Sequence, residues 1–268
     1  MFKQRHRATA AIFGLAVGLS PTTGSSQEID ILMALPAATL TFSAAFIAED
    51  AGFYKKEGLK VTYRTVVGVG AVNAVIAGSA DFTMGTGPVF LRAAAQGQRL
   101  LALANLVDKP LVELVLRKDV AEAAGISDKM PFTTEAVIKG SAIMLASAAS
   151  DAPDLLPFAY GLVYTRPDTC VKQREKCVRI ARALAGANRF IHEQPAEALE
   201  LLRKRFDKMD PVLLAAAWQV ASQAHAKDIR VTVPGLENSQ KVSLESKLLE
   251  PKDALTSFDG LYTDEFLR

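Results

Sequence analysis

The chain has 268 residues, of which 31 are Lys or Arg, 29 are Asp or Glu and 2 are Cys. This length suffices for a hydrophobic core, and two cysteines are too few for a small disulfide-rich scaffold. The formal charge of +2 is a property of the N-terminus: the first 26 residues carry Lys3, Arg5, Arg7 and no acid, and the remainder has 28 basic against 29 acidic residues. So nearly neutral a chain lacks the basic surface needed to bind nucleic-acid phosphates, and no nucleic acid is expected as a partner.

Residues 1–26 have the pattern of a secretory signal peptide. A basic segment precedes an uncharged apolar stretch from Ala8 to Leu19, and small polar residues suited to cleavage follow it. The stretch is shorter than the roughly 20 residues of a membrane-spanning helix, and no Cys follows it for lipid attachment. We therefore expect export to a bacterial periplasm, with a mature chain of about 242 residues if cleavage follows Ser26.

From Gln27 to Arg117, short β-like runs alternate with helical ones, which is typical of βαβ units and a parallel sheet. Helices are predicted over 42–51, 53–57 and 71–77, and from Pro88 onward. Thr39 or Thr41 is positioned to cap the first of them. The predicted strands are 29–35, 61–67, 82–84, 100–106 and 111–116.

Beyond Arg117 the pattern changes. Residues 119–140 have one or two helical turns, and the strand candidates 143–146 and 158–164 enclose a loop-like segment, 147–157. After Arg166 the pattern is wholly helical, with Asp210 as one N-cap. The helices expected there are 171–191, 195–206, 211–223 and 239–249. The predicted fold class is α/β with a helical C-terminal tail.

Three loops follow predicted strands and would lie at one sheet edge, where open parallel sheets bind ligands. They are Pro36–Thr41, Gly68–Ala71 and Gly85–Gly87. Backbone N–H groups at a helix start can hold an anion or a carbonyl oxygen. Tight glycine turns without a ligand are the simpler alternative. A dinucleotide fingerprint is excluded, because Asn73 occupies the place of its third glycine.

Catalytic and metal-ligating groups are scarce in these loops. His6 lies in the leader, and His192 and His225 are expected on solvated faces of the C-terminal helices. Asp81 begins a strand at the opposite edge, which indicates a structural role. No His, Cys or Glu cluster has metal-ligand spacing. The sequence thus predicts binding rather than chemistry, with no catalytic residue, metal or cofactor.

Cys170 and Cys177 are the two cysteines, and an oxidising compartment favours a disulfide between them over two free thiols. Inside one continuous helix they would be about 10 Å apart along its axis, too far for a bond. A disulfide therefore requires Cys170 to lie before the helix and to fold back on it.

Four segments, in this order and spacing, resemble the periplasmic solute-binding proteins of ABC importers, in the nitrate, sulfonate, taurine and thiamine-pyrimidine-precursor (SsuA/Thi5-like) group. They are AEDAGFYKKEGLKV at 48–61, Gly68–Gly70, AGSADF at 77–82 and AQGQ at 95–98. The resemblance implies a type II periplasmic-binding-protein fold, in which two α/β lobes joined by two crossing strands close on a ligand.

The implied lobes are unequal. Residues 27–118 with 165–268 make the first lobe and its helical tail, and 119–164 remain for the second. These 46 residues are fewer than the roughly 50 of the smallest domains. A reduced lobe, an internal deletion at Gly140–Ser141 and a gene-model error are the three explanations.

The resemblance implies a monomer that delivers a small anionic or heteroaromatic solute (a sulfonate, nitrate, carboxylate or pyrimidine-like molecule) to an ABC permease in the inner membrane. A binding-impaired or sensory protein is the alternative. An enzyme that makes the thiamine pyrimidine is disfavoured, since the loops lack its His and its cysteine-rich iron motif. The implied ligand-binding residues, none of them Lys or Arg, are Pro36, Thr39, Thr41, Gly70, Ala71, Gly85, Thr86 and Asn105.

Overall fold

The computed structural model describes residues 28–126 and 139–267. The leader predicted at 1–26 lies outside these residues. The main sheet has five strands in the order β2-β1-β3-β7-β4. The strands are β1 (Ile29–Leu35), β2 (Leu59–Thr65), β3 (Phe82–Gly85), β4 (Leu101–Asn105) and β7 (Leu162–Thr165).

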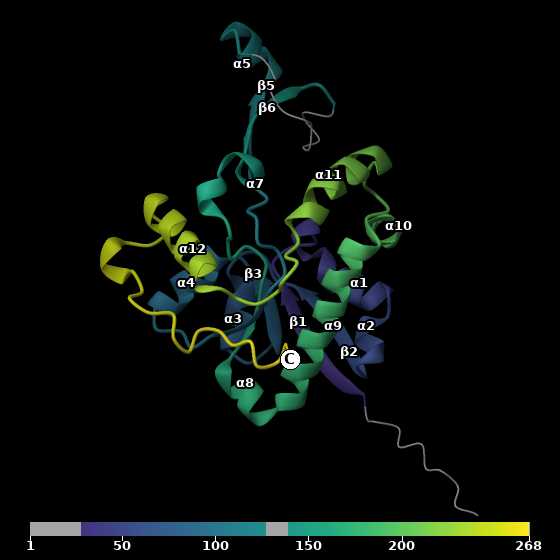
Figure 1. The fold of residues 1–268 in the computed structure, drawn as a ribbon, viewed down its shortest axis with the longest axis vertical. Helices are drawn as coiled ribbons and strands as arrows, with labels where there is room; N and C mark the ends of the chain where they lie inside the picture. Colours follow the sequence, from purple (N-terminus) through teal and green to yellow (C-terminus); the bar gives the residue numbers. More distant parts are fainter. Residues whose placement is uncertain (1–27, 127–138, 268) are drawn as a thin grey trace, which may run out of the picture.

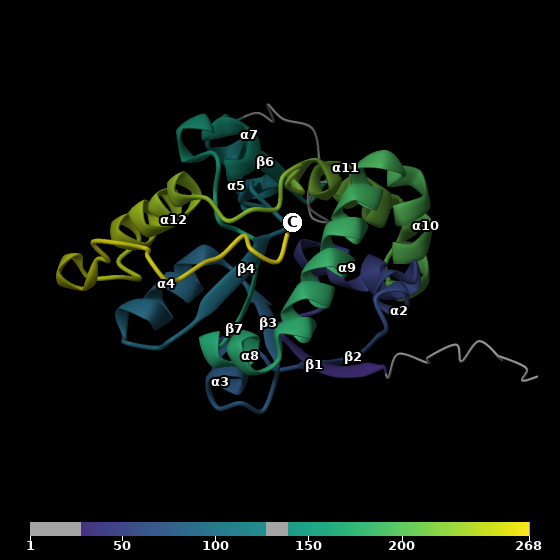
Figure 2. The same ribbon diagram turned by 60° about the horizontal axis from the view of Figure 1, so that its bottom comes forward.

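Helices cover both faces of this sheet, so its strands are buried on both sides (Figures 1 and 2). Met33 and Met84 belong to the core on one face, whereas Ala34 and Tyr164 belong to the core on the other. The first face packs against α1 (Ser43–Asp50), α2 (Phe53–Lys56), α9 (Arg174–Glu193), α10 (Pro195–Arg205) and α11 (Pro211–Ala224). The second packs against α3 (Gly70–Ile76), α4 (Gly87–Ala95) and α12 (Val233–Glu245).

The predicted α/β fold class is confirmed, and the main sheet contains the expected parallel strands together with one antiparallel strand. β2, β1 and β3 are parallel, but β7 is antiparallel to both β3 and β4. β7 comes from the end of the segment that the sequence assigns to a second lobe, yet it lies between two strands of the first. A short buried strand such as LVYT has the same pattern in either sheet, so the strand with which it pairs cannot be predicted from the sequence.

A second sheet contains two antiparallel strands, β5 (Glu113–Arg117) and β6 (Ala142–Ser147). The predicted 111–116 strand, which the sequence groups with the strands of the first lobe, thus pairs with β6 and does not join the main sheet. With α5 (Lys118–Ala123), these strands stand away from the main sheet (Figure 1). The segment expected as a loop at 147–157 contains α7 (Ala148–Asp151) and the 3-10 turn η2 (Pro153–Leu155).

Helix starts agree only in part with the predicted caps. The Asp210 carboxylate accepts hydrogen bonds from the Val212 and Leu213 N–H groups at 2.8 and 3.1 Å, as predicted. Thr39 does not cap α1, because the 3-10 turn η1 (Leu40–Phe42) precedes that helix and Thr39 makes no side-chain cap bond. Thr41 lies inside this turn. Within the described ranges, no helix combines the length and apolarity needed to cross a bilayer.

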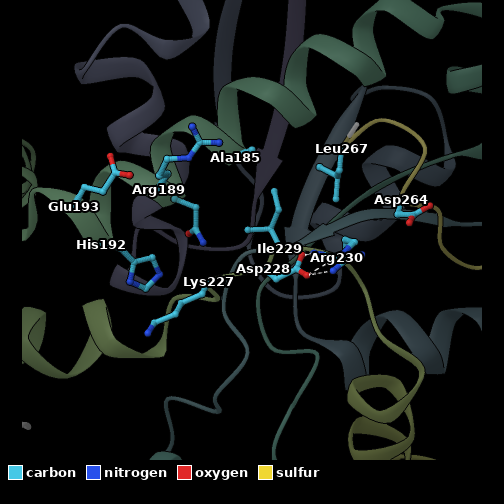
Figure 3. Close-up of a pocket in the computed structure, with 11 residues that line it drawn as sticks. Ala185, Arg189, His192, Glu193, Lys227, Asp228, Ile229, Arg230, Asp264 and Leu267 are labelled. Atoms are coloured by element: carbon cyan, nitrogen blue, oxygen red, sulfur yellow. Dashed lines mark hydrogen bonds and ion pairs between the residues drawn. The ribbon is translucent and has the colours of Figure 1, made fainter.

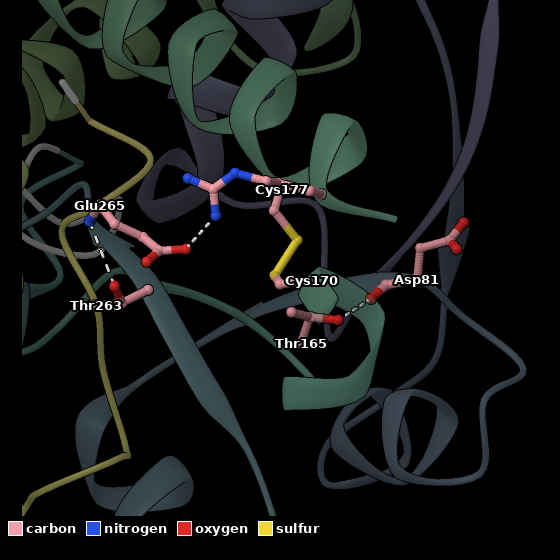
Figure 4. The surroundings of a disulfide bond; sticks show 7 residues. Asp81, Thr165, Cys170, Cys177, Thr263 and Glu265 are labelled. Atoms are coloured by element: carbon pink, nitrogen blue, oxygen red, sulfur yellow. Dashed lines mark hydrogen bonds and ion pairs between the residues drawn. A yellow bond between two sulfur atoms is a disulfide. The ribbon is translucent and has the colours of Figure 1, made fainter. Parts of the chain in front are cut away.

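Asp81 has the structural role expected of it. Its carboxylate accepts a hydrogen bond from the Leu32 N–H at 2.9 Å and pairs with the Lys176 ammonium at 2.9 Å. The Thr165 hydroxyl donates to its backbone carbonyl at 2.6 Å (Figure 4). These contacts tie β3 to β1, β7 and α9 at the edge opposite the three loops.

Cys170 and Cys177 form a disulfide across a break in the helix predicted over 171–191 (Figure 4). Cys170 lies in a separate short helix, α8 (Pro167–Lys172), and Cys177 lies in α9. The chain turns at Gln173, which brings the two Cα atoms to 5.6 Å. Cys170 therefore lies outside the helix of its partner, as a disulfide at this spacing requires.

Replacing both cysteines, C170A/C177A, should lower the free energy of unfolding by about 2 to 3 kcal/mol, because a short closed loop no longer restricts the unfolded chain. Denaturant unfolding of the exported protein measures this. Dithiothreitol should lower the free energy of unfolding of the wild type by a similar amount. It should not change that of the double variant. Two free thiols by mass spectrometry in untreated exported protein would contradict the bond.

Candidate functional site

The carboxyl ends of β1, β2, β3 and β4 meet at one edge of the main sheet, where β7 begins. Leu162, the first residue of β7, pairs with Gly85 of β3 on one side and with Asn105 of β4 on the other. Parallel pairing of β1 with β2 and β3 brings the loops after β1 and β2 to the same edge. The structure therefore places all eight predicted ligand-binding residues at this edge.

The eight residues differ in how far solvent reaches them. Thr39 is exposed, and Pro36, Thr41, Gly70 and Thr86 are half-buried. The buried ones are Ala71, Gly85 and Asn105. The loops thus offer groups to a solute, and the strand ends lie beneath them.

The helix start at Gly87 offers fewer free donors than expected. The Gly87 N–H donates to the Ala159 carbonyl at 2.7 Å, and Pro88 has no N–H group. Gly70, at the start of α3, donates to the Val67 carbonyl at 3.3 Å. An anion at the Gly85–Gly87 loop would therefore find these N–H groups used or missing.

Two buried side-chain atoms lack a hydrogen-bond partner among the described residues, Asn105 Oδ1 and the Tyr164 hydroxyl. The Asn105 Nδ2 group donates to the Phe158 carbonyl at 3.0 Å, so its amide is held while its oxygen is unpaired. A Cβ atom at Gly85 would lie 2.5 Å from the Tyr164 hydroxyl oxygen. Burial raises the pKa of Tyr164, which keeps the phenol neutral.

A cavity of about 180 Å³ connects this edge to the second sheet. Leu40 and Thr41 line it from η1, Glu113 from β5 and Ser147 from β6, and α11 supplies three apolar residues. Burial raises the pKa of Glu113. Sequence reasoning missed Glu113 and Ser147, because only the crossing of the chain between the two sheets brings them to this cavity. It also missed Tyr164, which packs beside Gly85 in the core.

A second cavity, of about 650 Å³, lies apart from the eight residues (Figure 3). Arg189 and His192 of α9, Lys227, and the ion pair of Arg230 with Asp228 line it. Its charges have both signs, and none of the predicted ligand residues lines it. It is therefore not part of the candidate site.

His225 is 2% exposed, which corrects the prediction of a solvated histidine; His192 is half-buried. The Nδ1 atom of His225 lies 2.6 Å from Asn188 Oδ1, and the Nε2 atom of His225 lies 2.9 Å from the Ser43 hydroxyl. Because the Asn188 oxygen can only accept, Nδ1 carries the proton and the Ser43 hydroxyl donates to Nε2. Burial, with a smaller contribution from the charge of His192, lowers the pKa of His225 to about 3.

This Ser–His–Asn chain has the order of a nucleophile, a base and an orienting group, but it is sealed. Ser43 is 0% and Asn188 1% exposed, so the hydroxyl has no access to a substrate. These two hydrogen bonds instead join α1, α9 and the segment after α11. Among the described residues, no group of three His, Cys, Asp or Glu side chains could hold a metal ion.

Residues 40–129 match the family model described as NMT1/THI5 like, which confirms the predicted resemblance over this segment. No curated protein sequence matches the chain. Solved structures are similar at low identity and share its fold.

A Bordetella bronchiseptica protein has a TM-score of 0.72 at 17% identity, over 88% of this chain and 95% of its own. A Candida albicans gene product with the generic periplasmic binding protein fold has 0.66 at 13%, over 88% and 96%. The alkanesulfonate-binding protein SsuA of Xanthomonas axonopodis pv. citri, bound to MOPS, has 0.65 at 14%, over 90% and 100%. The chain thus has the periplasmic binding protein fold.

Gly85→Ala should destabilise the protein by about 1 to 3 kcal/mol, because the new methyl group meets the Tyr164 hydroxyl. Tyr164→Phe alone should leave stability equal or higher, since it removes an unpaired buried hydroxyl. In the double variant the cost of Gly85→Ala should fall, as the remaining ring atoms lie 3.3 Å away. Denaturant unfolding of all four proteins measures this coupling, and strict additivity would contradict it.

His225 should make the protein acid-sensitive. The unfolded histidine takes up a proton below its ordinary pKa of about 6.5, whereas the folded one stays neutral down to about 3. Stability is therefore present above pH 6.5 and falls as the pH drops from there toward 3, by about 2 kcal/mol between pH 7 and pH 5. In urea unfolding, the His225→Gln variant should not show this decrease in the free energy of unfolding between pH 7 and pH 5. The His192→Gln variant should show it as the wild type does. Equal pH slopes in wild type and His225→Gln would refute this assignment.

Proposed function

We propose that this chain is an exported solute-binding protein that presents a small solute to an ABC permease in the inner membrane. The observation that carries the proposal is the convergence of three loops and four strand ends at one sheet edge, in a chain with the periplasmic binding protein fold. The leader pattern of residues 1–26 and the NMT1/THI5-like segment support it. The protein acts as a monomer, without a cofactor and without catalysis.

The five-stranded sheet with its helices forms the first lobe, and β5, α5 and β6 form a reduced second lobe. The cavity lined by Thr41, Glu113 and Ser147 lies where residues of the two meet. The eight loop and strand-end residues hold the solute from the first lobe, through hydroxyl, amide and backbone groups. The reduced lobe adds few groups of its own to this wall.

A sensory or partner-binding protein is the second candidate. The reduced lobe exposes several large apolar side chains, which favours contact with another protein. They are Val112, Leu114, Val115, Val120 and Ile126. In that case the solute site would be vestigial.

Thermal unfolding with a panel of small solutes separates these candidates. The panel contains nitrate, alkanesulfonates, aromatic carboxylates and pyrimidines, with the matching amides of the sulfonates and carboxylates as uncharged analogues. A solute at a concentration of 100 times its Kd increases the free energy of unfolding by about 2.7 kcal/mol. This raises Tm by roughly 5 to 10 °C. Thr41→Leu and Thr86→Leu, which each remove a hydroxyl at the edge, should weaken this shift.

Thr62→Leu is the matched control, because Thr62 is exposed in the middle of β2. The Tm of this variant should rise with solute as that of the wild type does. Absence of stabilisation by every member of the panel would favour the second candidate.

A further inference from the structure

We propose that the cavity between η1, α11 and the second sheet binds one compact apolar group of the solute, about the size of a single aromatic ring. This rests on the proposed function and narrows its substrate class, because nitrate has no such group. It also assigns specificity to α11, a helix that contains none of the eight predicted ligand-binding residues. Three features of the cavity lead to it: the lining, the volume and the way α11 is held.

Most of the cavity wall is apolar and comes from three parts of the fold. Leu40 lines it from η1, Leu111 lines it from the segment between β4 and β5, and α11 contributes the other apolar residues. These are Ala217, Val220 and Ala221. Such a wall favours an apolar group, because moving apolar surface out of water is favourable.

The cavity is open to solvent, so a solute can reach it. Six of its eight lining residues are half-buried, and the other two, Ser147 and Ala221, are buried. Glu113, the one charged residue of the lining, is among the half-buried ones and keeps contact with water. The cavity therefore differs from Asn105 Oδ1 and the Tyr164 hydroxyl, which are sealed in the core.

Two hydroxyl groups, those of Thr41 and Ser147, belong to the polar part of the lining. The Ser147 N–H donates to the Asp151 carboxylate at 2.8 Å, so Ser147 makes this contact through its backbone and not through its hydroxyl. Thr41 is one of the eight predicted residues, and it joins the cavity to the loops at the sheet edge. The apolar group of the solute should therefore carry a hydrogen-bonding group beside it.

The cavity volume of about 180 Å³ limits the size of the apolar group. In another protein, an apolar cavity of about 150 Å³ binds benzene. One six-membered ring or a short branched alkyl chain therefore fits. A fused two-ring group would extend beyond the cavity into solvent.

The helix α11 is held so that its small residues face the cavity. Ala217 precedes Val220 and Ala221 by three and four residues, so the three share one face of the helix. On an adjacent side, Trp218 is 3% exposed, and its indole N–H donates to the Pro195 carbonyl at 3.0 Å. This anchor fixes the rotation of α11. The two alanines thus leave open a space that a leucine would fill.

Two series of solutes, each with a constant polar group, test this by calorimetric titration into the exported protein at pH 7. They are alkanesulfonates and carboxamides with straight chains of increasing length, each with a benzene and a naphthalene member. In a series that binds, affinity should rise about fourfold for each CH₂ that enters the cavity and then level off. The naphthalene member should bind no more tightly than the benzene member, and nitrate should not bind.

Variants of α11 assign the effect to this helix. Ala217→Leu should fill the cavity and weaken binding of the benzene member at least about tenfold, with little change for the shortest chain. Val220→Ala should enlarge the cavity and strengthen binding of the naphthalene member relative to the benzene member. Gln219→Leu is the matched control, because Gln219 is exposed on α11 and does not line the cavity. It should change neither affinity, and thermal unfolding checks that each variant is folded.

Affinity that is independent of chain length, or that Ala217→Leu leaves unchanged, would overturn this inference and leave the proposed function intact. Tight binding of nitrate would do the same. If neither series binds while another solute of the thermal panel stabilises the protein, the inference alone is wrong. If no solute binds at all, both the inference and the proposed solute binding are wrong.

Discussion

The insertion of β7 between β3 and β4 is the constraint on which the rest of the structure depends. The chain leaves the main sheet after β4, makes a second small sheet, and returns as β7, which pairs antiparallel with both β3 and β4. Both crossings therefore start and end at the same sheet edge. This brings Gly85, Leu162 and Asn105 into one register and carries Tyr164 into the core beside Gly85.

The two crossing segments touch where they leave the sheet, and this contact requires a glycine. A Cβ atom at Gly161 would lie 2.9 Å from Val107 atoms, and the Gly161 N–H donates to the Val107 carbonyl. Val107 also forms a bridge with His225, whose ring is held by Asn188 and Ser43. The buried histidine thus fixes the start of one crossing against α1 and α9, and a charge there would loosen the contact from which the second sheet departs.

Sequence patterns predicted the structure correctly where the local signal is strong. Residues 29–35 form β1 over the predicted range, the Asp210 cap is present, and the cysteines lie on either side of a helix break. Patterns failed where tertiary pairing decides the outcome. Nothing local distinguishes β7 from a strand of the small sheet, and a histidine after a helix has the same sequence context whether it is solvated or, as His225 is, sealed by Asn188 and Ser43.

The candidate site shows the same division. Loops that follow strands could be assigned to one edge because parallel strands share a direction, and the structure places them there. The chemistry of the edge could not be predicted, since the Gly87 N–H expected to face a ligand is bonded to the carbonyl of Ala159, which lies on the returning crossing. Glu113 and Ser147 join the site from strands of the other sheet. The chain between β4 and β7 therefore brings groups to the edge that no local pattern reveals.

Asn105 and Tyr164 are costly choices for a sheet interior. Each leaves a polar atom unpaired, at a cost of about 1 to 3 kcal/mol, where apolar side chains of similar shape would be stable. Gly85 adds to this cost, because its missing side chain makes the space that the phenol occupies. The neighbouring strands β3, β7 and β4 thus carry stability-lowering residues at the edge of the sheet from which both crossings emerge.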